Sequence, residues 1–247
     1  MSMDILQQLP IWQKNHLEDC ANKCLFKDKK VLEVGGYTPV EIANSLGVKS
    51  WYCVDPAFER TTKINDNFIL FKEYIENFDK DADFDFIIAT NSFEHIHHFD
   101  ICLDAMYRLL KQSGKLSALL GPIWSCYKGH HVWFNTQDNR LVNFNNIKLD
   151  DWAHLLYSKS KIKKQLLLNY DEYISDNISN WIFENTFLNR MFYDDYKNSV
   201  DKSSFKILEF RDWHTSKYPK PAIQQKLELK YHCKNFSTVS IKMILEK

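Results

Sequence analysis

Apolar residues in the first half of the chain gather in short runs, separated by stretches with helical spacing. Five runs have the length and composition of β-strands, at residues 29–36, 51–56, 68–71, 83–92 and 115–122. The fourth run has a nearly continuous apolar centre, which is typical of a parallel strand buried on both faces. Between the fourth and fifth runs, Ile101, Ala105 and Leu109 recur at helical spacing. This alternation predicts right-handed βαβ crossovers and a doubly wound sheet.

Residues that favour helix ends punctuate this pattern. Thr38 can cap a helix, Pro39 suits the first turn of that helix, and Gly47 can end it. Ser113 and Gly114 predict the end of the helix that precedes the fifth run.

The regular alternation stops after Pro122, where a region rich in aromatic side chains begins. Helices are expected near 150–158, near 179–198 and from Pro221, and two further strands at 205–210 and 238–246. The pattern therefore predicts an α/β fold with a doubly wound, seven-stranded, mostly parallel sheet and a helical insertion after strand five.

This organisation divides the chain into four expected segments. They are an N-terminal helical segment at 1–28, an α/β core at 29–122, a helical and aromatic insertion at 123–204, and the final strands at 205–247. An insertion after strand five would lie over the carboxyl edge of the sheet, where open α/β sheets bind ligands.

Composition narrows the class of protein. The 247 residues are 45% hydrophobic and 26% charged, with 32 basic and 32 acidic side chains, so the chain is globular and has no basic excess for gripping nucleic acid. The six cysteines include no CxxC pair and are expected to be reduced. The N-terminus has no signal-peptide pattern, and no stretch approaches the roughly 18 apolar residues of a membrane span. We expect a cytoplasmic protein that uses neither a membrane nor nucleic acid.

The segment VLEVGGYTP at 31–39, followed by Asp55 at the end of the next strand, is the sharpest candidate site. A carboxylate twenty residues after Gly35 can accept hydrogen bonds from both hydroxyls of a nucleoside ribose. Glu33 would favour a cationic ligand and repel a diphosphate, and Pro39 removes one backbone N–H from the helix start. S-adenosylmethionine (SAM) therefore fits better than NAD, although Gly35 and Gly36 could simply form a tight turn.

Four segments, VLEVGG, VDP, FDFIIATNSFEHIHHF and LLKQSGKLSALLGP, follow one another in this order. They resemble the motif series of class I SAM-dependent methyltransferases, and within these the small-molecule subgroup with a strand-four motif ending in Phe-Glu-His-Ile. The resemblance covers about residues 29–122 and the two final strands. Tyr37 and Pro39 replace the second and third glycines of the Gly-x-Gly-x-Gly loop of that family.

This resemblance implies S-adenosylmethionine as cofactor and a set of residues around it. Glu33, Gly35, Gly36 and Tyr37 would surround the methionine part, Asp55 would bind the ribose, Pro56, Glu73 and Tyr74 would shape the adenine pocket, and Asn91 and Ser92 would lie beneath the sulfonium. Glu94 and His95 would open the next helix, as structural residues or as part of the acceptor pocket.

The segment GPIWSCYKGHHVW at 121–133 carries the candidate catalytic residues, His130 and His131. It resembles a Trp-Ser-x-x-x-Gly-His-His stretch found in some methyltransferases of bacterial polysaccharide gene clusters. A hydroxyl acceptor must lose its proton, which favours a base that is poised near neutral pH. One of the two histidines is expected to be that base, unless it only packs in the core. No metal is expected, since no carboxylate pair has the spacing of a magnesium site.

Together these observations predict a SAM-dependent methyltransferase that modifies an oxygen, less readily a nitrogen, of a small polar or sugar-type acceptor. A role in capsule or surface-polysaccharide biosynthesis is the expected setting. The alternatives are an NAD or nucleotide-sugar enzyme with the same sheet and a non-catalytic SAM-binding subunit. An RNA methyltransferase is disfavoured by the charge balance. The sequence leaves the oligomeric state open.

Overall fold

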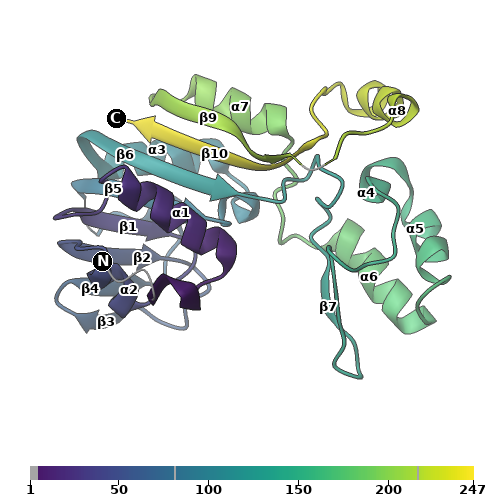
Figure 1. The fold of residues 1–247 in the computed structure, drawn as a ribbon, viewed down its shortest axis with the longest axis horizontal. Coiled ribbons are helices and arrows are strands. Elements are labelled where there is room, and N and C mark those ends of the chain that lie inside the picture. Colours follow the sequence, from purple (N-terminus) through teal and green to yellow (C-terminus); the bar gives the residue numbers. More distant parts are fainter. Residues whose placement is uncertain (1–4, 81, 216) are drawn as a thin grey trace. The chain divides into compact units, whose positions relative to one another are not determined.

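A computed structural model describes residues 5–80, 82–215 and 217–247 (Figure 1). Its strands are β1 (Lys30–Val34), β2 (Ser50–Val54), β3 (Thr62–Asn65), β4 (Phe68–Phe71), β5 (Phe84–Thr90), β6 (Leu110–Leu120), β7 (Trp133–Asn135), β8 (Leu141–Asn143), β9 (Lys206–Thr215) and β10 (Thr238–Glu246). Its α-helices are α1 (Ile11–Asn22), α2 (Val40–Ser45), α3 (Phe99–Leu109), α4 (Ala153–Leu156), α5 (Lys159–Leu166), α6 (Glu172–Glu184), α7 (Tyr193–Lys202) and α8 (Pro221–Tyr231). Short 3-10 turns occur at η1 (Ile5–Gln8), η2 (Ile75–Asn77) and η3 (Phe93–His95).

The main sheet has the order β3-β4-β2-β1-β5-β6-β10-β9. Strands β4, β2, β1, β5 and β6 are parallel neighbours, which confirms the predicted α/β fold with a mostly parallel sheet. All seven predicted strands form, and β3 is an additional strand antiparallel to β4 at the edge of the sheet. The sequence gives no sign of β3 because it has four residues, three of them exposed, and therefore lacks a buried face.

Two predicted helix ends are wrong. Pro39, and not Thr38, is the N-cap residue of α2, and the Thr38 hydroxyl donates to the Glu33 carboxylate instead. Helix α3 ends at Leu109, and Ser113 and Gly114 lie inside β6, which starts directly after the helix. Ser113 has φ 62°, and the pairing of β5 with β6 shifts register near this point, so this irregular strand start resembled a helix end in the sequence.

The predicted helical segment near 179–198 consists of two helices, α6 and α7, separated by a break. Helix α6 ends at Glu184, and the Arg190 guanidinium donates to the carbonyls of Ile182, Phe183 and Asn185 at 3.3, 3.0 and 3.0 Å. The last carbonyls of a helix have no partner within it, so a cation at this end satisfies them and complements the helix dipole.

The chain forms two compact units. The first comprises Met1–Leu120, Asn198–Arg211 and Lys242–Lys247, and the second comprises Gly121–Lys197 and Asp212–Ile241. No helix among the described residues has the length and apolar character needed to cross a bilayer.

In the first unit, α1 packs on the sheet through both apolar and polar contacts. Leu17 and Cys20 of α1 belong to the same buried cluster as Trp51 of β2 and Phe86 of β5. The fully buried ammonium of Lys242 on β10 forms an ion pair with Asp19 of α1. An ion pair of this kind offsets the cost of burying the lysine charge.

His16, one turn before the ion pair, is a buried polar anchor of α1. Its Nδ1 lies 2.7 Å from the Thr90 hydroxyl and its Nε2 lies 2.9 Å from the Ser117 hydroxyl, so both ring nitrogens contact the sheet. Burial, reinforced by the nearby charge of Lys242, lowers the pKa of His16 to about 3. The imidazole is therefore neutral at physiological pH.

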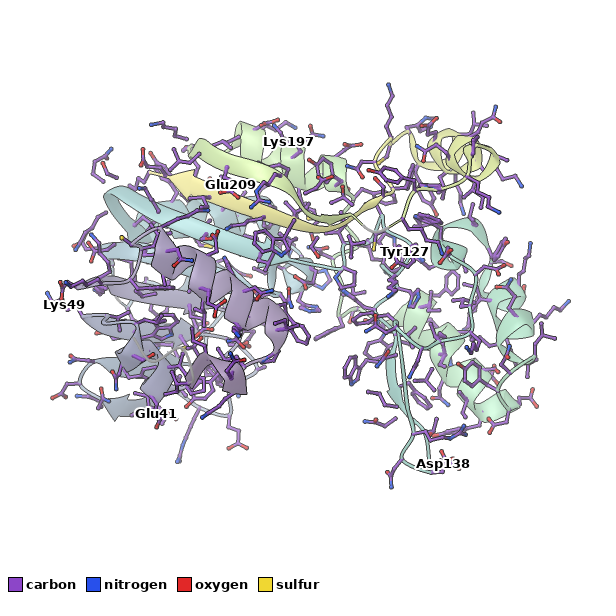
Figure 2. All side chains as sticks on the ribbon, viewed as in Figure 1. Glu41, Lys49, Tyr127, Asp138, Lys197 and Glu209 are labelled. Carbon is purple, nitrogen blue, oxygen red and sulfur yellow. The ribbon has the colours of Figure 1, made fainter. Side chains whose placement is uncertain are left out.

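The second unit has two apolar clusters of its own. The first joins the β7–β8 hairpin to α5 and α6, through residues such as Val132, Val142, Ile162 and Ile178. The second holds Trp152, Leu155, Leu227 and Phe236, from the regions of α4 and α8. Tyr127 belongs to this unit (Figure 2). The centre of its ring lies 5.9 Å from that of Trp152.

The depressed pKa of His16 predicts a loss of stability in acid. The unfolded chain protonates this group near its ordinary value of 6.5, whereas the folded chain resists protonation down to about 3. The contribution of neutral His16 to the free energy of unfolding is thus fully present above pH 6.5. Below that pH the contribution decreases by about 1.4 kcal/mol per pH unit. Urea unfolding of wild type and His16→Gln between pH 7 and about pH 4.5 isolates the effect. The variant should lose less stability than wild type over this range, and parallel curves would contradict the interpretation.

Candidate functional site

The carboxyl ends of the parallel strands form one edge of the first unit, and the predicted cofactor residues leave the sheet there. The hydrogen-bond ladder continues one residue beyond each strand. Gly35 N donates to the last carbonyl of β2 at 3.0 Å, Asp55 N to that of β4 at 3.1 Å, and Asn91 N to a carbonyl of β6 at 2.7 Å. Three loops from separate parts of the sequence therefore start side by side.

Glu33, the fourth residue of β1, is buried and accepts four hydrogen bonds. Its carboxylate receives Thr38 N and Thr38 Oγ1, each at 2.9 Å, Trp51 Nε1 at 2.9 Å, and the Cys53 thiol at 3.3 Å. Burial raises the pKa of Glu33, and these donors oppose that rise. The carboxylate thus ties the end of the glycine loop to β2, a role that the sequence did not suggest.

Gly35 occupies a position that no other residue fits. Its φ is +69°, and a Cβ atom there would lie 2.4 Å from Cβ of Ser92. Ser92 is itself fixed, since its hydroxyl donates to the Val34 carbonyl at 2.8 Å. The glycine loop therefore packs directly against the turn that follows β5.

Asp55 connects the loop after β2 to the glycine loop. One carboxylate oxygen accepts Ala57 N at 2.7 Å and the other accepts Gly36 N at 3.0 Å. Each carboxylate oxygen has a second lone pair, so the half-buried group keeps capacity for two ligand hydroxyls. This arrangement suits a ribose.

The backbone N–H groups of the glycine loop are largely engaged by the protein. Gly35 N bonds to β2, Gly36 N to Asp55, and Thr38 N to Glu33. Pro39 has no N–H to offer. A dinucleotide needs these donors for its diphosphate, whereas S-adenosylmethionine carries no phosphate and does not. The loop therefore fits S-adenosylmethionine and argues against the NAD alternative.

The other predicted cofactor residues lie in the loops around this edge. Tyr37 is 45% exposed, and its ring meets Phe68 edge-on at 6.2 Å. Tyr74 is 57% exposed, its backbone N–H donates to Glu73 at 3.1 Å, and Pro56 is exposed beside Asp55. Hydrogen bonds and close packing thus connect the residues of the glycine loop with its neighbours, namely Glu33, Gly35, Gly36, Asp55 and Ser92. The side chains of Tyr37, Pro56 and Tyr74 are exposed.

The predicted catalytic histidines belong to the second unit. His130 is buried, and its Nδ1 accepts the Val132 N–H at 3.2 Å. His131 is also buried, has φ 47°, and its carbonyl accepts the indole N–H of Trp181 at 3.1 Å. Burial, together with the neighbouring histidines, lowers the pKa of His130 well below its ordinary value, so the ring is neutral at pH 7.

His154 is a further histidine of this unit that sequence reasoning missed. Its ring centre lies 5.5 Å from that of His130, and its Nε2 lies 2.9 Å from the Trp124 carbonyl. Burial lowers its pKa to about 4. The 23 residues between His130 and His154 carry no periodic signal, so only the fold brings the two rings together. Among the described residues, no group of three metal-binding side chains occurs.

Comparison with known proteins gives a consistent result. A family model described as a methyltransferase domain matches residues 12–164, more than half of the chain. Among curated proteins, none is similar enough in sequence to count as a match.

Solved structures share the fold across nearly the whole chain. An S-adenosylmethionine dependent methyltransferase from Mesorhizobium loti is 9% identical with a TM-score of 0.54, covering 93% of this chain and 96% of its own. A candidate S-adenosylmethionine dependent methyltransferase from Listeria monocytogenes is 15% identical with a TM-score of 0.52, covering 94% and 98%. A candidate methyltransferase from Bacillus halodurans C-125 is 12% identical with a TM-score of 0.51, covering 94% and 99%.

At such low identities these structures establish the fold, and the family model establishes the class of enzyme. The chain belongs to the class I S-adenosylmethionine-dependent methyltransferases, and S-adenosylmethionine is its cofactor.

Proposed function

We propose that this enzyme methylates a hydroxyl oxygen of a small polar or sugar-type acceptor in capsule or surface-polysaccharide biosynthesis, with a nitrogen as the second candidate for the methylated atom. The observation that carries the proposal is the edge of the first unit where the glycine loop, Asp55 and Ser92 are bonded together. Bound there, S-adenosylmethionine supplies a methyl group on a good leaving group. The protein then has to align the acceptor, exclude water and accept a proton.

The cofactor residues follow from this edge. Gly35, Gly36 and Tyr37 are proposed to lie along the methionine part, with Glu33 holding the loop in shape. Asp55 is proposed to accept the ribose hydroxyls, using the lone pairs that Gly36 and Ala57 leave open. Further contacts are proposed for Pro56, Glu73 and Tyr74 at the adenine and for Asn91 and Ser92 near the sulfonium.

The proton acceptor is proposed to be His130 or His131. Burial keeps the His130 imidazole neutral, so it has a lone pair for a proton, while the lowered pKa makes it a weaker base than an exposed histidine. The Nδ1 lone pair of His130 already receives Val132 N–H, so accepting a proton there would break that bond.

The aromatic side chains of the second unit divide into two groups. Trp152 is 2% exposed and its indole N–H donates to the Phe236 carbonyl at 3.0 Å, so it belongs to the core. Trp133 is 51% exposed and presents a large ring that a sugar or aromatic acceptor can stack on. The Trp-Ser-x-x-x-Gly-His-His resemblance is the support for a polysaccharide acceptor.

The direct test combines binding with turnover. Calorimetry should detect S-adenosylmethionine and S-adenosylhomocysteine binding, and NAD should give no heat. A panel of neutral glycosides and phenols, matched with amines, should show release of S-adenosylhomocysteine with hydroxyl acceptors first. Turnover on RNA or on amines alone would contradict the proposed acceptor class.

Asp55→Ala should weaken S-adenosylmethionine binding by about 1–3 kcal/mol, because it removes charge-assisted bonds to the ribose and frees Gly36 N. Isothermal titration measures the change. Asp66→Ala is the matched control, since Asp66 is an exposed carboxylate that forms an ion pair with Lys63 on the edge hairpin. Equal affinity for the wild type and Asp55→Ala would remove the ribose assignment.

Glu33→Gln should lower the stability of the first unit by about 1–3 kcal/mol. The amide would turn an NH₂ group toward donors from Thr38, Trp51 and Cys53 that now meet a carboxylate. Denaturant unfolding checks this expectation, and cofactor affinity should fall with it. Glu41→Gln, an exposed carboxylate on α2, is the control and should behave as wild type.

His130→Ala and His131→Ala should both retain cofactor affinity, while one of them lowers turnover by roughly 10²–10⁴-fold. Calorimetry measures the affinity and initial rates measure the turnover, so each variant serves as the fold control for the other. Unchanged rates in both variants would place the base elsewhere.

A further inference from the structure

Helix α1, which lies on one face of the main sheet, makes two polar contacts with the cofactor edge of the first unit (Figure 1). Gln13 Nε2 donates to the Thr38 hydroxyl at 3.3 Å, at the end of the glycine loop. One turn later, His16 Nδ1 lies 2.7 Å from the Thr90 hydroxyl, at the end of β5. Residues three apart lie side by side on the surface of an α-helix, so one rigid element reaches both loops.

The contact of Gln13 continues to the buried carboxylate under the glycine loop. The Thr38 hydroxyl accepts from Gln13 and donates to Glu33 at 2.9 Å, so the three side chains form one series of hydrogen bonds. Gln13 thereby orients the hydroxyl that ties the end of the glycine loop back to β1.

The contact of His16 supports the turn that follows β5. Asn91 in this turn has φ 51°, a left-handed conformation that a residue other than glycine adopts only where the surrounding structure holds it. On one side of Asn91, Ser92 donates to the Val34 carbonyl at 2.8 Å. On the other side, Thr90 is held by His16. The turn against which the glycine loop packs is therefore fixed at both of its ends.

His16 also bridges two neighbouring strands. Its Nε2 lies 2.9 Å from the Ser117 hydroxyl of β6, and both side chains are fully buried. Ser117 is in register with Ile88, two residues before Thr90, so the two hydroxyls lie on the same face of the sheet. An apolar side chain could fill the volume of the ring, but it could not hold these two hydroxyls.

We infer that Gln13 and His16 are positioning residues for the cofactor, and that they hold the glycine loop and the turn after β5 in the arrangement that binds S-adenosylmethionine. They act through Thr38 and Thr90 and do not themselves touch the cofactor. Without these bonds the two loops sample other arrangements, and the cofactor must order them when it binds, which lowers its affinity. The inference goes beyond the proposed function, because it concerns the methyl donor and holds for any acceptor.

Thr90→Val and Ser117→Ala are a matched pair of variants that separates positioning from packing. Each removes one hydroxyl and leaves one nitrogen of His16 without its partner, so both should lower the midpoint of urea unfolding by similar amounts. By calorimetry on the full-length protein, S-adenosylmethionine should bind about tenfold more weakly to Thr90→Val and within about twofold of wild type to Ser117→Ala. Equal losses of affinity in the two variants would mean that His16 only packs α1 on the sheet, and would overturn the inference.

Two conservative substitutions of His16 provide a rescue experiment. An asparagine places its polar atoms near the position of Nδ1 and can still bond to Thr90, whereas a glutamine reaches the position of Nε2 and can still bond to Ser117. His16→Asn should therefore keep the affinity for S-adenosylmethionine within about threefold of wild type, and His16→Gln should lower it about tenfold. The reverse order of affinities would contradict the role assigned to the bond with Thr90.

Gln13→Ala tests the second contact. Its expected loss of affinity is smaller, about threefold, because the bond to the Thr38 hydroxyl is long. Asn15→Ala on the same helix is the control, since the Asn15 side chain forms no hydrogen bond with a described residue. Equal affinities of these two variants would remove Gln13 from the positioning residues.

The double variant Thr90→Val/His16→Gln distinguishes positioning from direct contact with the cofactor. If Thr90 is held in place by His16, the double variant should bind S-adenosylmethionine no more weakly than Thr90→Val alone. Losses that add would show that Thr90 itself contacts the cofactor independently of His16, and the positioning role of His16 would be refuted.

Discussion

The buried carboxylate of Glu33 is the constraint on which the cofactor edge depends. A carboxylate withdrawn from water is costly, and four donors from Thr38, Trp51 and Cys53 offset that cost. Because Thr38 gives both its backbone N–H and its hydroxyl, the loop must return to β1 within five residues. That short return needs the positive φ angles of Gly35 and Gly36, and it leaves Gly36 N pointing to Asp55. One charge placed inside the sheet thus fixes the loop that the ligand meets.

The fold could be predicted from the sequence because a strand that is buried on both faces has a nearly continuous run of apolar residues. The run at 83–92 is apolar enough to be assigned as a strand, and β5 forms there. The edge strand β3 has no such pattern, since only one of its four residues is half-buried and the other three are exposed. Boundaries failed where side chains were used for tertiary contacts, as when Thr38 bonded to Glu33 and not to the start of α2. The Thr38 hydroxyl bonds to a carboxylate five residues earlier in the chain instead of capping the helix.

The sequence predicted those residues of the candidate site that have a short, regular spacing or that belong to a family motif, as Ser92 does. Gly35, Gly36 and Asp55 belong to one strand-loop-helix-strand unit whose spacing follows from the fold, and the structure joins them by hydrogen bonds. His16 and His154 contact partners that are 74 and 30 residues away, so no local pattern announces them. The role of Glu33 was also hidden, because charge alone does not show whether a carboxylate faces a ligand or the core.

Groups that could attract an anion are engaged by the protein in the first unit and held neutral in the second, and this bears on selectivity. The loop of the first unit spends its N–H groups on Glu33, Asp55 and the sheet, so little remains to attract an anion. The imidazoles of His130 and His154 in the second unit are held neutral by burial, which removes the attraction to anions that a protonated histidine would provide. A donor with a sulfonium fits the first environment, and the proposed acceptor with an uncharged hydroxyl fits the second. A phosphate-bearing cofactor would find the N–H donors of the first unit already engaged. A carboxylate acceptor would find an environment of low polarity in the second unit. Selection in this enzyme therefore depends on which hydrogen bonds the protein has already formed.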